Sequence, residues 1–313
     1  MKRSLSLKCF SNPAAIVAFA LISIFTQHDI FGKSRKHLLF QAGAGHRSIL
    51  DEIADVFKRR HPDVRVDFSY NRSGYFLEDM AVSKKGDLYM PGGEYYILQA
   101  QKKGFIEDYN PEKDVPAYFI PVIITPKGNP KSIHSIADFA NPGIRVGLGD
   151  SSKACSIGMW HEKLFNKAGI WEKVRKNAAM RAICISELVN ACRLNEIDAA
   201  IVWTNAAILF LKDIDISPIE PEYRSVIKIP VAVLKFGMHP KEAKELKDFI
   251  LSDEGKKIFH SHGYCIDPNK ADEDIKWAME ACRVANDPSI PITEETVGPF
   301  VKEVKRLREA DKE

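Results

Sequence analysis

A strand that ends in small residues and runs directly into a helix is the feature that most constrains how this chain can fold. Residues 38–42 are mostly apolar, Gly43, Ala44 and Gly45 form a turn, and the stretch up to Leu50 reads as the first turn of a helix. Such a turn lets backbone N–H groups approach a ligand, and the helix start adds unpaired donors and the positive end of the helix dipole. The stretch therefore favours binding of an oxyanion. The alternative is a tight turn that binds nothing, because no dinucleotide-binding or P-loop glycine spacing is present.

Composition excludes one large class of function. The 313 residues carry 45 basic and 42 acidic side chains, for a formal charge of +3. This mixed surface lacks the basic stripe of a nucleic-acid binder, and the length is sufficient for two lobes with cores of their own. We therefore expect no nucleic-acid partner.

The first residues of the chain resemble an export signal. Lys2, Arg3 and Lys8 precede an apolar run over residues 14–25, which is too short for a comfortable membrane span. We expect residues 1–33 to be a signal peptide, or a retained N-terminal anchor, since no clear cleavage site follows Phe25. The mature protein is then expected in the periplasm or on the extracytoplasmic face of the membrane.

Five cysteines lie beyond this segment, and an odd number cannot all pair within one chain. They show no Cys-x-x-Cys motif and no zinc-site spacing. Two disulfides are compatible with export, Cys184–Cys192 and Cys265–Cys282, but free buried thiols explain the cysteines equally well.

Strand and helix signals alternate along the chain, which predicts an α/β fold with mainly parallel sheets. Two long apolar strands, 119–124 and 226–234, bracket the central region. They predict that the chain crosses from a first lobe to a second and later returns, which creates a hinge and a cleft. Residues 267–313 read as two further helices.

Several segments of the chain together resemble the molybdate- and tungstate-binding branch of the periplasmic solute-binding proteins of ABC transporters, from about Leu38 to Tyr264. The segments are Asp51-Glu52-Ile53-Ala54-Asp55-Val56-Phe57 with His61-Pro62, Phe68-Ser69-Tyr70-Asn71-Arg72-Ser73-Gly74, Val146-Gly147-Leu148-Gly149-Asp150 with Cys155-Ser156-Ile157-Gly158, and Asn195 to Trp203, followed by Phe249 to Gly255. The resemblance implies the two-lobed type II fold, with a hinge of two crossover strands and a C-terminal helical extension. The expected parts are lobe 1 at 37–118 plus 235–266, lobe 2 at 119–234 with the crossover strands, and the extension at 267–313.

The resemblance also implies a function and a ligand-binding set. The expected function is capture of a tetrahedral oxyanion, molybdate or tungstate, for delivery to the permease of an ABC importer by a monomer that needs no cofactor. The residues assigned to the ligand by position or by neighbourhood are Ala44, Gly45, His46, Arg47, Ser73, Cys155, Ser156, Ile185 and Trp203. Gly45 replaces a serine usual in the family, Trp203 a tyrosine, and Asn205 lies near the place of an aspartate.

The chemistry of this set suits a fully ionised anion. Uncharged donors at several helix starts can hold a buried dianion without a full countercharge. A pocket made only of donors would leave the O–H of a protonated anion without an acceptor, so we expect it to reject phosphate. Arg47 and Arg72 either reach the anion through two N–H groups or remain solvated at the rim, and His46 either contacts the ligand or is structural.

Other functions remain open at this point. The same fold could bind sulfate, a small organic acid or a ferric ion, for which the neighbouring Tyr95 and Tyr96 are candidate ligands. Adjacent residues of a helix point about 100° apart, however, so we expect no cation-binding metal site there. An enzyme is disfavoured because no nucleophile elbow or His-Glu-x-x-His motif is present, although Cys155 lies at a helix start. A sensor or surface interaction module is the last alternative.

Overall fold

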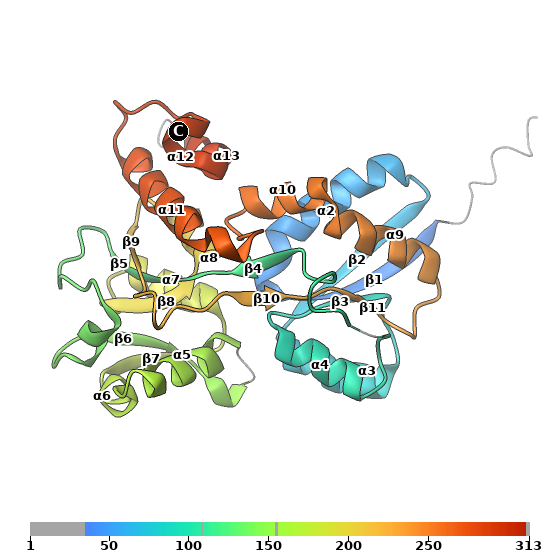
Figure 1. Ribbon diagram of the computed structural model, residues 1–313, viewed down its shortest axis with the longest axis horizontal. Coiled ribbons are helices and arrows are strands. Elements are labelled where there is room, and N and C mark those ends of the chain that lie inside the picture. Colours follow the sequence, from blue (N-terminus) through green and yellow to red (C-terminus); the bar gives the residue numbers. More distant parts are fainter. Residues whose placement is uncertain (1–34, 108, 154–155, 311–313) are drawn as a thin grey trace, which may run out of the picture. The chain divides into compact units, whose positions relative to one another are not determined.

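The computed structural model describes residues 35–107, 109–153 and 156–310. The expected signal segment, residues 1–33, and Cys155 lie outside this part. Residues 37–313 form one unit that contains a four-stranded sheet, a five-stranded sheet and a two-stranded ribbon (Figure 1). The expected α/β class is therefore confirmed. Among the described residues, no helix combines the length and the apolar character that a membrane crossing requires.

The first sheet has the strand order β11-β3-β1-β2, with β1 parallel to β3 and β11 antiparallel to it. Its strands are β1 (Lys36–Gly43), β2 (Val64–Asn71), β3 (Leu88–Met90) and β11 (Ala232–Val233). Its helices are α2 (Arg47–Arg60), α3 (Ser73–Ser83), α4 (Glu94–Lys102), α9 (Pro240–Leu251) and α10 (Asp253–Ser261). The helix predicted after the first turn is α2. Its apolar residues recur at helical spacing, and of these Ile49, Leu50, Ile53 and Phe57 are buried while Val56 is partly buried.

The second sheet has the strand order β7-β6-β8-β5-β9. Its strands are β5 (Pro121–Pro126), β6 (Val146–Gly149), β7 (Ala178–Ala182), β8 (Ala199–Trp203) and β9 (Ile214–Pro218). Its helices are α5 (Ser156–Lys167), α6 (Trp171–Lys176), α7 (Ile185–Arg193) and α8 (Thr204–Ala207).

The expectation of mainly parallel sheets is wrong for this second sheet. Strand β6 is parallel to β7 and β8, but β5 is antiparallel to both β8 and β9. The register explains why: Pro121 at the start of β5 pairs with Trp203 at the end of β8. Strand β5 thus begins at the edge of the sheet where β6 and β8 end, so it runs in the opposite direction to them.

Both predicted crossover strands are broken. Strand β4 (Ala117–Phe119) pairs antiparallel with β10 (Ile227–Ile229) in the two-stranded ribbon, and each then continues into a different sheet as β5 or β11. The breaks occur at Ile120, before Pro121, and at Pro230, because proline cannot donate to a strand ladder. A third segment joins this region, since Tyr118 and Cys265 exchange two backbone hydrogen bonds of 2.7 and 3.1 Å. The boundaries of the two lobes stay a prediction.

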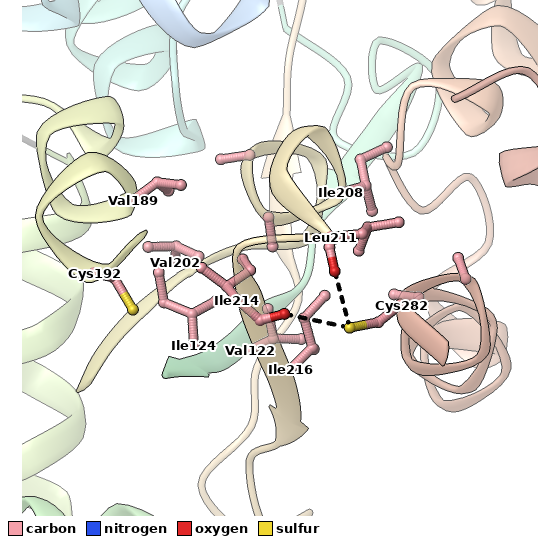
Figure 2. Close-up of a cluster of buried hydrophobic side chains, with 14 of the residues drawn as sticks. Val122, Ile124, Val189, Cys192, Val202, Ile208, Leu211, Ile214, Ile216 and Cys282 are labelled. Carbon is pink, nitrogen blue, oxygen red and sulfur yellow. Dashed lines mark hydrogen bonds between the residues drawn. The ribbon is translucent and has the colours of Figure 1, made fainter. Parts of the chain in front are cut away.

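The C-terminal helices share a core with the second sheet. They are α11 (Ala271–Asn286), α12 (Glu294–Val297) and α13 (Val301–Glu309), and the second predicted helix is divided by Gly298 and Pro299. Figure 2 shows side chains of this core, including Val122, Val202, Ile214 and Cys282. The core contains Phe300 and Val304 as well as the sheet residues Ile124 and Ile216.

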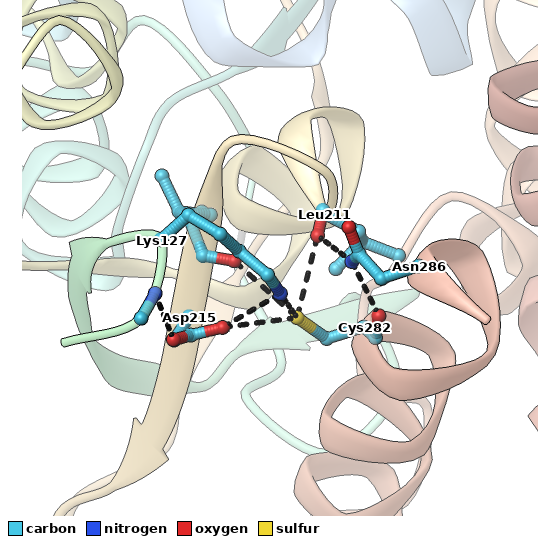
Figure 3. Close-up of polar contacts among 7 residues, drawn as sticks. Lys127, Leu211, Asp215, Cys282 and Asn286 are labelled. Carbon is cyan, nitrogen blue, oxygen red and sulfur yellow. Dashed lines mark hydrogen bonds and ion pairs between the residues drawn. The ribbon is translucent and has the colours of Figure 1, made fainter. Parts of the chain in front are cut away.

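Each of the four described cysteines is a free thiol, so neither candidate disulfide forms. The thiol of Cys282 donates to the carbonyl oxygens of Leu211 and Ile214, both at 3.3 Å. Next to Cys282, the Lys127 ammonium donates a hydrogen bond to the Asp215 carboxylate (Figure 3), and the two atoms are 2.7 Å apart. Burial raises the pKa of Cys282 despite the neighbouring Lys127 ammonium, which fits a packed structural thiol.

Candidate functional site

A pocket of about 140 Å³ lies where strands of both sheets end. This volume is well below the ~300–1,000 Å³ of pockets that take drug-sized molecules, so the pocket suits a small ligand. None of the described residues that line it is an aspartate or glutamate. They are Gly43, Ala44, Gly45, His46, Asn71, Arg72, Ser73, Gly92, Phe119, Ser156, Ile157, Ile183, Cys184, Ile185, Ser186, Trp203 and Asn205.

Two helix starts of the first sheet face this pocket. The turn after β1 forms a short 3-10 helix, Ala44–His46, which leads into α2. Helix α3 begins at Ser73, whose buried hydroxyl oxygen accepts a hydrogen bond from the Gly92 backbone N–H at 2.9 Å. Because that bond uses a lone pair, the hydroxyl proton of Ser73 stays available to a ligand.

Helix α5 brings a second hydroxyl to the same place from the second sheet. A Cβ atom added at Gly92 would lie 3.2 Å from Ser156 Oγ and 3.6 Å from Ser73 Oγ. The Ser73 and Ser156 hydroxyls therefore both lie close to Gly92. Both residues line the same pocket.

The turn before α5 is set by close backbone packing. A Cβ atom on Gly149 would lie 2.6 Å from the Gly158 backbone nitrogen, so the start of α5 approaches the end of β6 more closely than side chains permit. Buried His161 fixes the same turn, because its Nδ1 accepts from the Gly149 N–H and its Nε2 donates to the Ile201 carbonyl. Burial lowers the pKa of His161 to about 4, so this ring is neutral at pH 7.

Helix α7 adds a further helix start. Cys184 is its N-cap, and Ile185 and Ser186 are its first residues. The Glu187 carboxylate accepts the Ile183 backbone N–H at 2.8 Å and so holds the approach to the helix. Together with the starts of α3 and α5, α7 directs backbone donors and positive dipole ends at a pocket that no described carboxylate lines.

A stack of rings forms one wall of the pocket. His46 stacks on Phe119 at 5.5 Å between centroids, and Phe119 stacks on Trp203 at 5.1 Å. Burial lowers the pKa of His46 to about 4, although a hydrogen bond to the Pro91 backbone opposes the shift. His46 is therefore a neutral ring at pH 7 and contributes no charge to the pocket.

Tyr264 joins the two sides of the site behind this wall. Its hydroxyl donates to the Gly45 carbonyl at 3.0 Å and lies 3.1 Å from His46 Nδ1. Burial raises the pKa of Tyr264, and a hydrogen bond from the Asn205 side chain opposes the shift. Asn205 is 8% exposed, and its Oδ1 is buried with no hydrogen-bond partner among the described residues.

The structure brings together most of the predicted ligand-binding residues. Those that line the pocket are Ala44, Gly45, His46, Ser73, Ser156, Ile185 and Trp203. Arg47 does not: its guanidinium lies over the Tyr70 ring, 4.4 Å from the centroid, because the first turn of α2 points this side chain toward β2. Cys155 lies outside the described residues.

Sequence reasoning omitted several residues from the predicted set. Asn71 adjoins Ser73 in the quoted motif, and Cys184 adjoins Ile185, so a wider window would have found them, whereas Arg72 was weighed there as a contact or a solvated rim residue. Gly92 and Phe119 carried no local signal, since only folding brings them to the site. Asn205 also lines the pocket, and its Oδ1 is buried with no hydrogen-bond partner among the described residues.

A cation site is not supported in the part of the chain that the structure describes. No group of three or more His, Cys, Asp or Glu side chains there could hold a metal ion. The neighbouring Tyr95 and Tyr96 diverge, because Tyr95 is 57% exposed while Tyr96 is buried in the core of α3 and α4.

Comparison with known proteins identifies the family of this chain. The model of the bacterial extracellular solute-binding protein family matches residues 38–265. A Haemophilus influenzae protein named "Putative binding protein" is 26% identical over 234 residues, which are 75% of this chain and 93% of that protein. The molybdate-binding protein ModA of Mycobacterium tuberculosis is 23% identical over 227 residues, 71% of this chain and 82% of that protein.

Solved structures agree on the fold. The sulfate-binding protein SubI from Mycobacterium tuberculosis superposes with a TM-score of 0.65 at 20% identity, covering 76% of this chain and 90% of that one. The family match spans more than two thirds of the chain and includes every described residue that lines the pocket. Family members are solute-binding proteins rather than enzymes, in agreement with the missing catalytic motifs. The chain belongs to the bacterial extracellular solute-binding proteins.

Proposed function

We propose that this protein captures a small tetrahedral oxyanion in the pocket between Ser73 and Ser156 and delivers it to an ABC importer. One observation carries the proposal: helix starts of both sheets direct donors into one pocket that no described carboxylate lines. An anion gains from each of these partial positive charges, whereas a cation would be repelled by them. The proposed ligand contacts are Ala44, Gly45, His46, Ser73, Ser156, Ile185 and Trp203.

Molybdate and tungstate are the first ligands to test. The related Mycobacterium tuberculosis protein is named as a molybdate-binding protein, and the sequence motifs resemble the same branch. The small volume of the pocket supports an inorganic anion over a larger organic solute. Arg72 at the rim adds one positive charge to attract either anion.

The proposed place of action is outside the cytoplasm, with a membrane permease as partner. Family membership and the basic, then apolar, N-terminal sequence support export. Donors from both sheets would contact the bound anion, so binding would favour one position of the two sheets relative to each other. A ligand shifts such a conformational equilibrium only when it binds one conformation more tightly than the other.

A thermal-shift screen with molybdate, tungstate, sulfate and phosphate tests the proposal. A ligand that binds only the folded protein stabilises it by about 2.7 kcal/mol at 100 times its Kd. We expect at least one oxyanion to raise Tm and Ser73→Ala to reduce that rise. Ser83→Ala at the other end of α3 is the matched control and should keep it, because the Ser83 hydroxyl contacts Asp79 and the Lys85 backbone N–H and does not line the pocket. No shift with any anion would refute oxyanion capture.

A further inference from the structure

We propose that Lys302 of α13 holds the two sides of the pocket together by pairing with Glu52 of α2, so that the C-terminal helices set how tightly the protein keeps its anion. Lys302 is then a positioning residue for the proposed function, on which this inference rests. The family match ends at residue 265, before α11 begins at Ala271. Family membership therefore does not account for these helices.

The two helices that carry the pair pack against different sheets. Val304 of α13 lies in the core of the second sheet, whereas Ile53 of α2 lies in the core of the first sheet. A change in the position of one sheet relative to the other would leave each helix on its own core. The contact between Lys302 and Glu52 would then have to break or form.

The Glu52 carboxylate receives two donors at one oxygen. Lys302 Nζ lies 2.6 Å from Glu52 Oε2, and His262 Nε2 lies 2.9 Å from the same atom. His262 directly follows α10, which packs against α2, so it holds the carboxylate from the side of the first sheet. Burial opposes ionisation of Glu52, but the hydrogen bonds from Lys302 and His262 outweigh it and lower the pKa of this carboxyl. Glu52 is therefore ready to receive the Lys302 charge.

The pair is linked to the pocket through α2. This helix follows the turn Ala44–His46, whose residues line the pocket. The same structure brings Ser73 and Ser156 close to Gly92, so the pair is formed while both sides of the pocket are assembled. An anion that needs the assembled form binds in proportion to the fraction of protein in that form. A contact that stabilises this form therefore strengthens binding without touching the anion.

Reversing the two charges separates this role from a long-range effect of charge on the anion. Glu52→Lys and Lys302→Glu should each raise the Kd for molybdate, or for the tightest-binding anion of the thermal-shift screen, by about three- to tenfold, because attraction becomes repulsion at a partly exposed pair. The double variant restores the pair in reverse and should return Kd to near the wild-type value. If the charges acted only through their long-range field, Glu52→Lys would strengthen anion binding instead.

Lys305→Glu is the matched control, because Lys305 is exposed on the same helix and its reversal changes the net charge equally. Isothermal titration measures Kd, and stopped-flow fluorescence measures the rate at which the anion dissociates. The pair should act mainly on this rate, since the assembled form must open before the anion leaves. Lys302→Glu should therefore speed dissociation, whereas Lys305→Glu should leave it unchanged. A merely structural role of Lys302 would lower Tm without changing the dissociation rate.

The outcomes separate this inference from the proposed function. Equal dissociation rates in the wild-type, Lys302→Glu and Lys305→Glu proteins would overturn the role of Lys302 and leave oxyanion capture standing, as would tighter binding by Glu52→Lys. Failure of the wild-type protein to bind any anion would reject the proposed function. Small-angle X-ray scattering of the anion-free proteins then tests the pair alone. Each single variant should have a larger radius of gyration than the wild type and the double variant, and equal radii would overturn the inference.

Discussion

The Tyr264 hydroxyl donates to the Gly45 carbonyl oxygen over 3.0 Å and thereby ties the segment after α10 to the glycine turn after β1. These residues are 219 positions apart in the chain. Through this contact the Tyr264 side chain positions the first predicted anion-binding turn. Tyr264 also contacts the other side of the pocket, since Asn205 bonds the same hydroxyl. Tyr264 is therefore a positioning residue for the site.

Tyr264→Phe should weaken oxyanion binding and lower stability. The variant leaves the Gly45 carbonyl without this donor, and a buried group left unpaired costs about 1–3 kcal/mol. Isothermal titration and urea unfolding measure the two effects. Tyr109→Phe is the matched control, because its hydroxyl bonds Glu94 and neither residue lines the pocket. Equal anion affinity in the Tyr264→Phe and Tyr109→Phe variants would contradict the positioning role.

Stability should fall as the pH is lowered from about 6.5 to about 4. Burial lowers the pKa of His46 and of His161 to about 4, while each titrates near 6.5 in the unfolded chain. Between these values the unfolded chain binds more protons, so acid favours unfolding, and the stabilisation is complete above pH 6.5. Each group steepens the pH dependence by up to about 1.4 kcal/mol per pH unit.

Urea unfolding between pH 4.5 and 7.5 measures this slope. His161→Gln removes one titrating ring and should reduce the slope over that window, even where the variant is less stable at every pH. His134→Gln is the control, because His134 is exposed. A slope that His161→Gln leaves unchanged would show that the folded protein does not keep His161 neutral.

The sequence predicted the parts of the site that lie next to strong local patterns. The glycine turn after β1 with the helix that follows it, and the motif around Ser73, each depend on a few adjacent residues, so they could be recognised. Phe119 and Gly92 reach the pocket only through the packing of distant elements, and no neighbouring residue signals it. Arg47 is not among the residues that line the pocket, because its guanidinium lies over the Tyr70 ring of β2, a contact that depends on how the strands pair.

Gly92→Ala should weaken anion binding with little loss of stability. The new methyl carbon would lie 3.2 Å from Ser156 Oγ, which is tight, and it would occupy the space between the two serine hydroxyls. We expect at least a tenfold loss of affinity, equivalent to about 1.4 kcal/mol. Gly93→Ala is the matched control, because a Cβ there meets only Ile227 at an ordinary 3.7 Å and Gly93 is not among the residues that line the pocket. Titration of both variants with the tightest-binding anion compares them, and equal affinities would mean that the gap beside Gly92 does not hold the ligand.

The C-terminal helices should prove part of the folded unit rather than a separable module. Phe300 is fully buried in the core that α11 and α13 share with the second sheet, so Phe300→Ala should cost about 3–5 kcal/mol through lost contacts and a cavity. Met279→Ala on α11 is the control, because Met279 is 39% exposed and should change stability by about 0.5 kcal/mol or less. Chemical unfolding followed by tryptophan fluorescence measures both. If the helices were an independent module, Phe300→Ala would melt them in a separate transition and leave the midpoint for the two sheets, and anion binding, unchanged. A single cooperative transition shifted to lower urea is instead expected, because the apolar faces of these helices are buried against β5 and β9 and stay buried only while that sheet is folded.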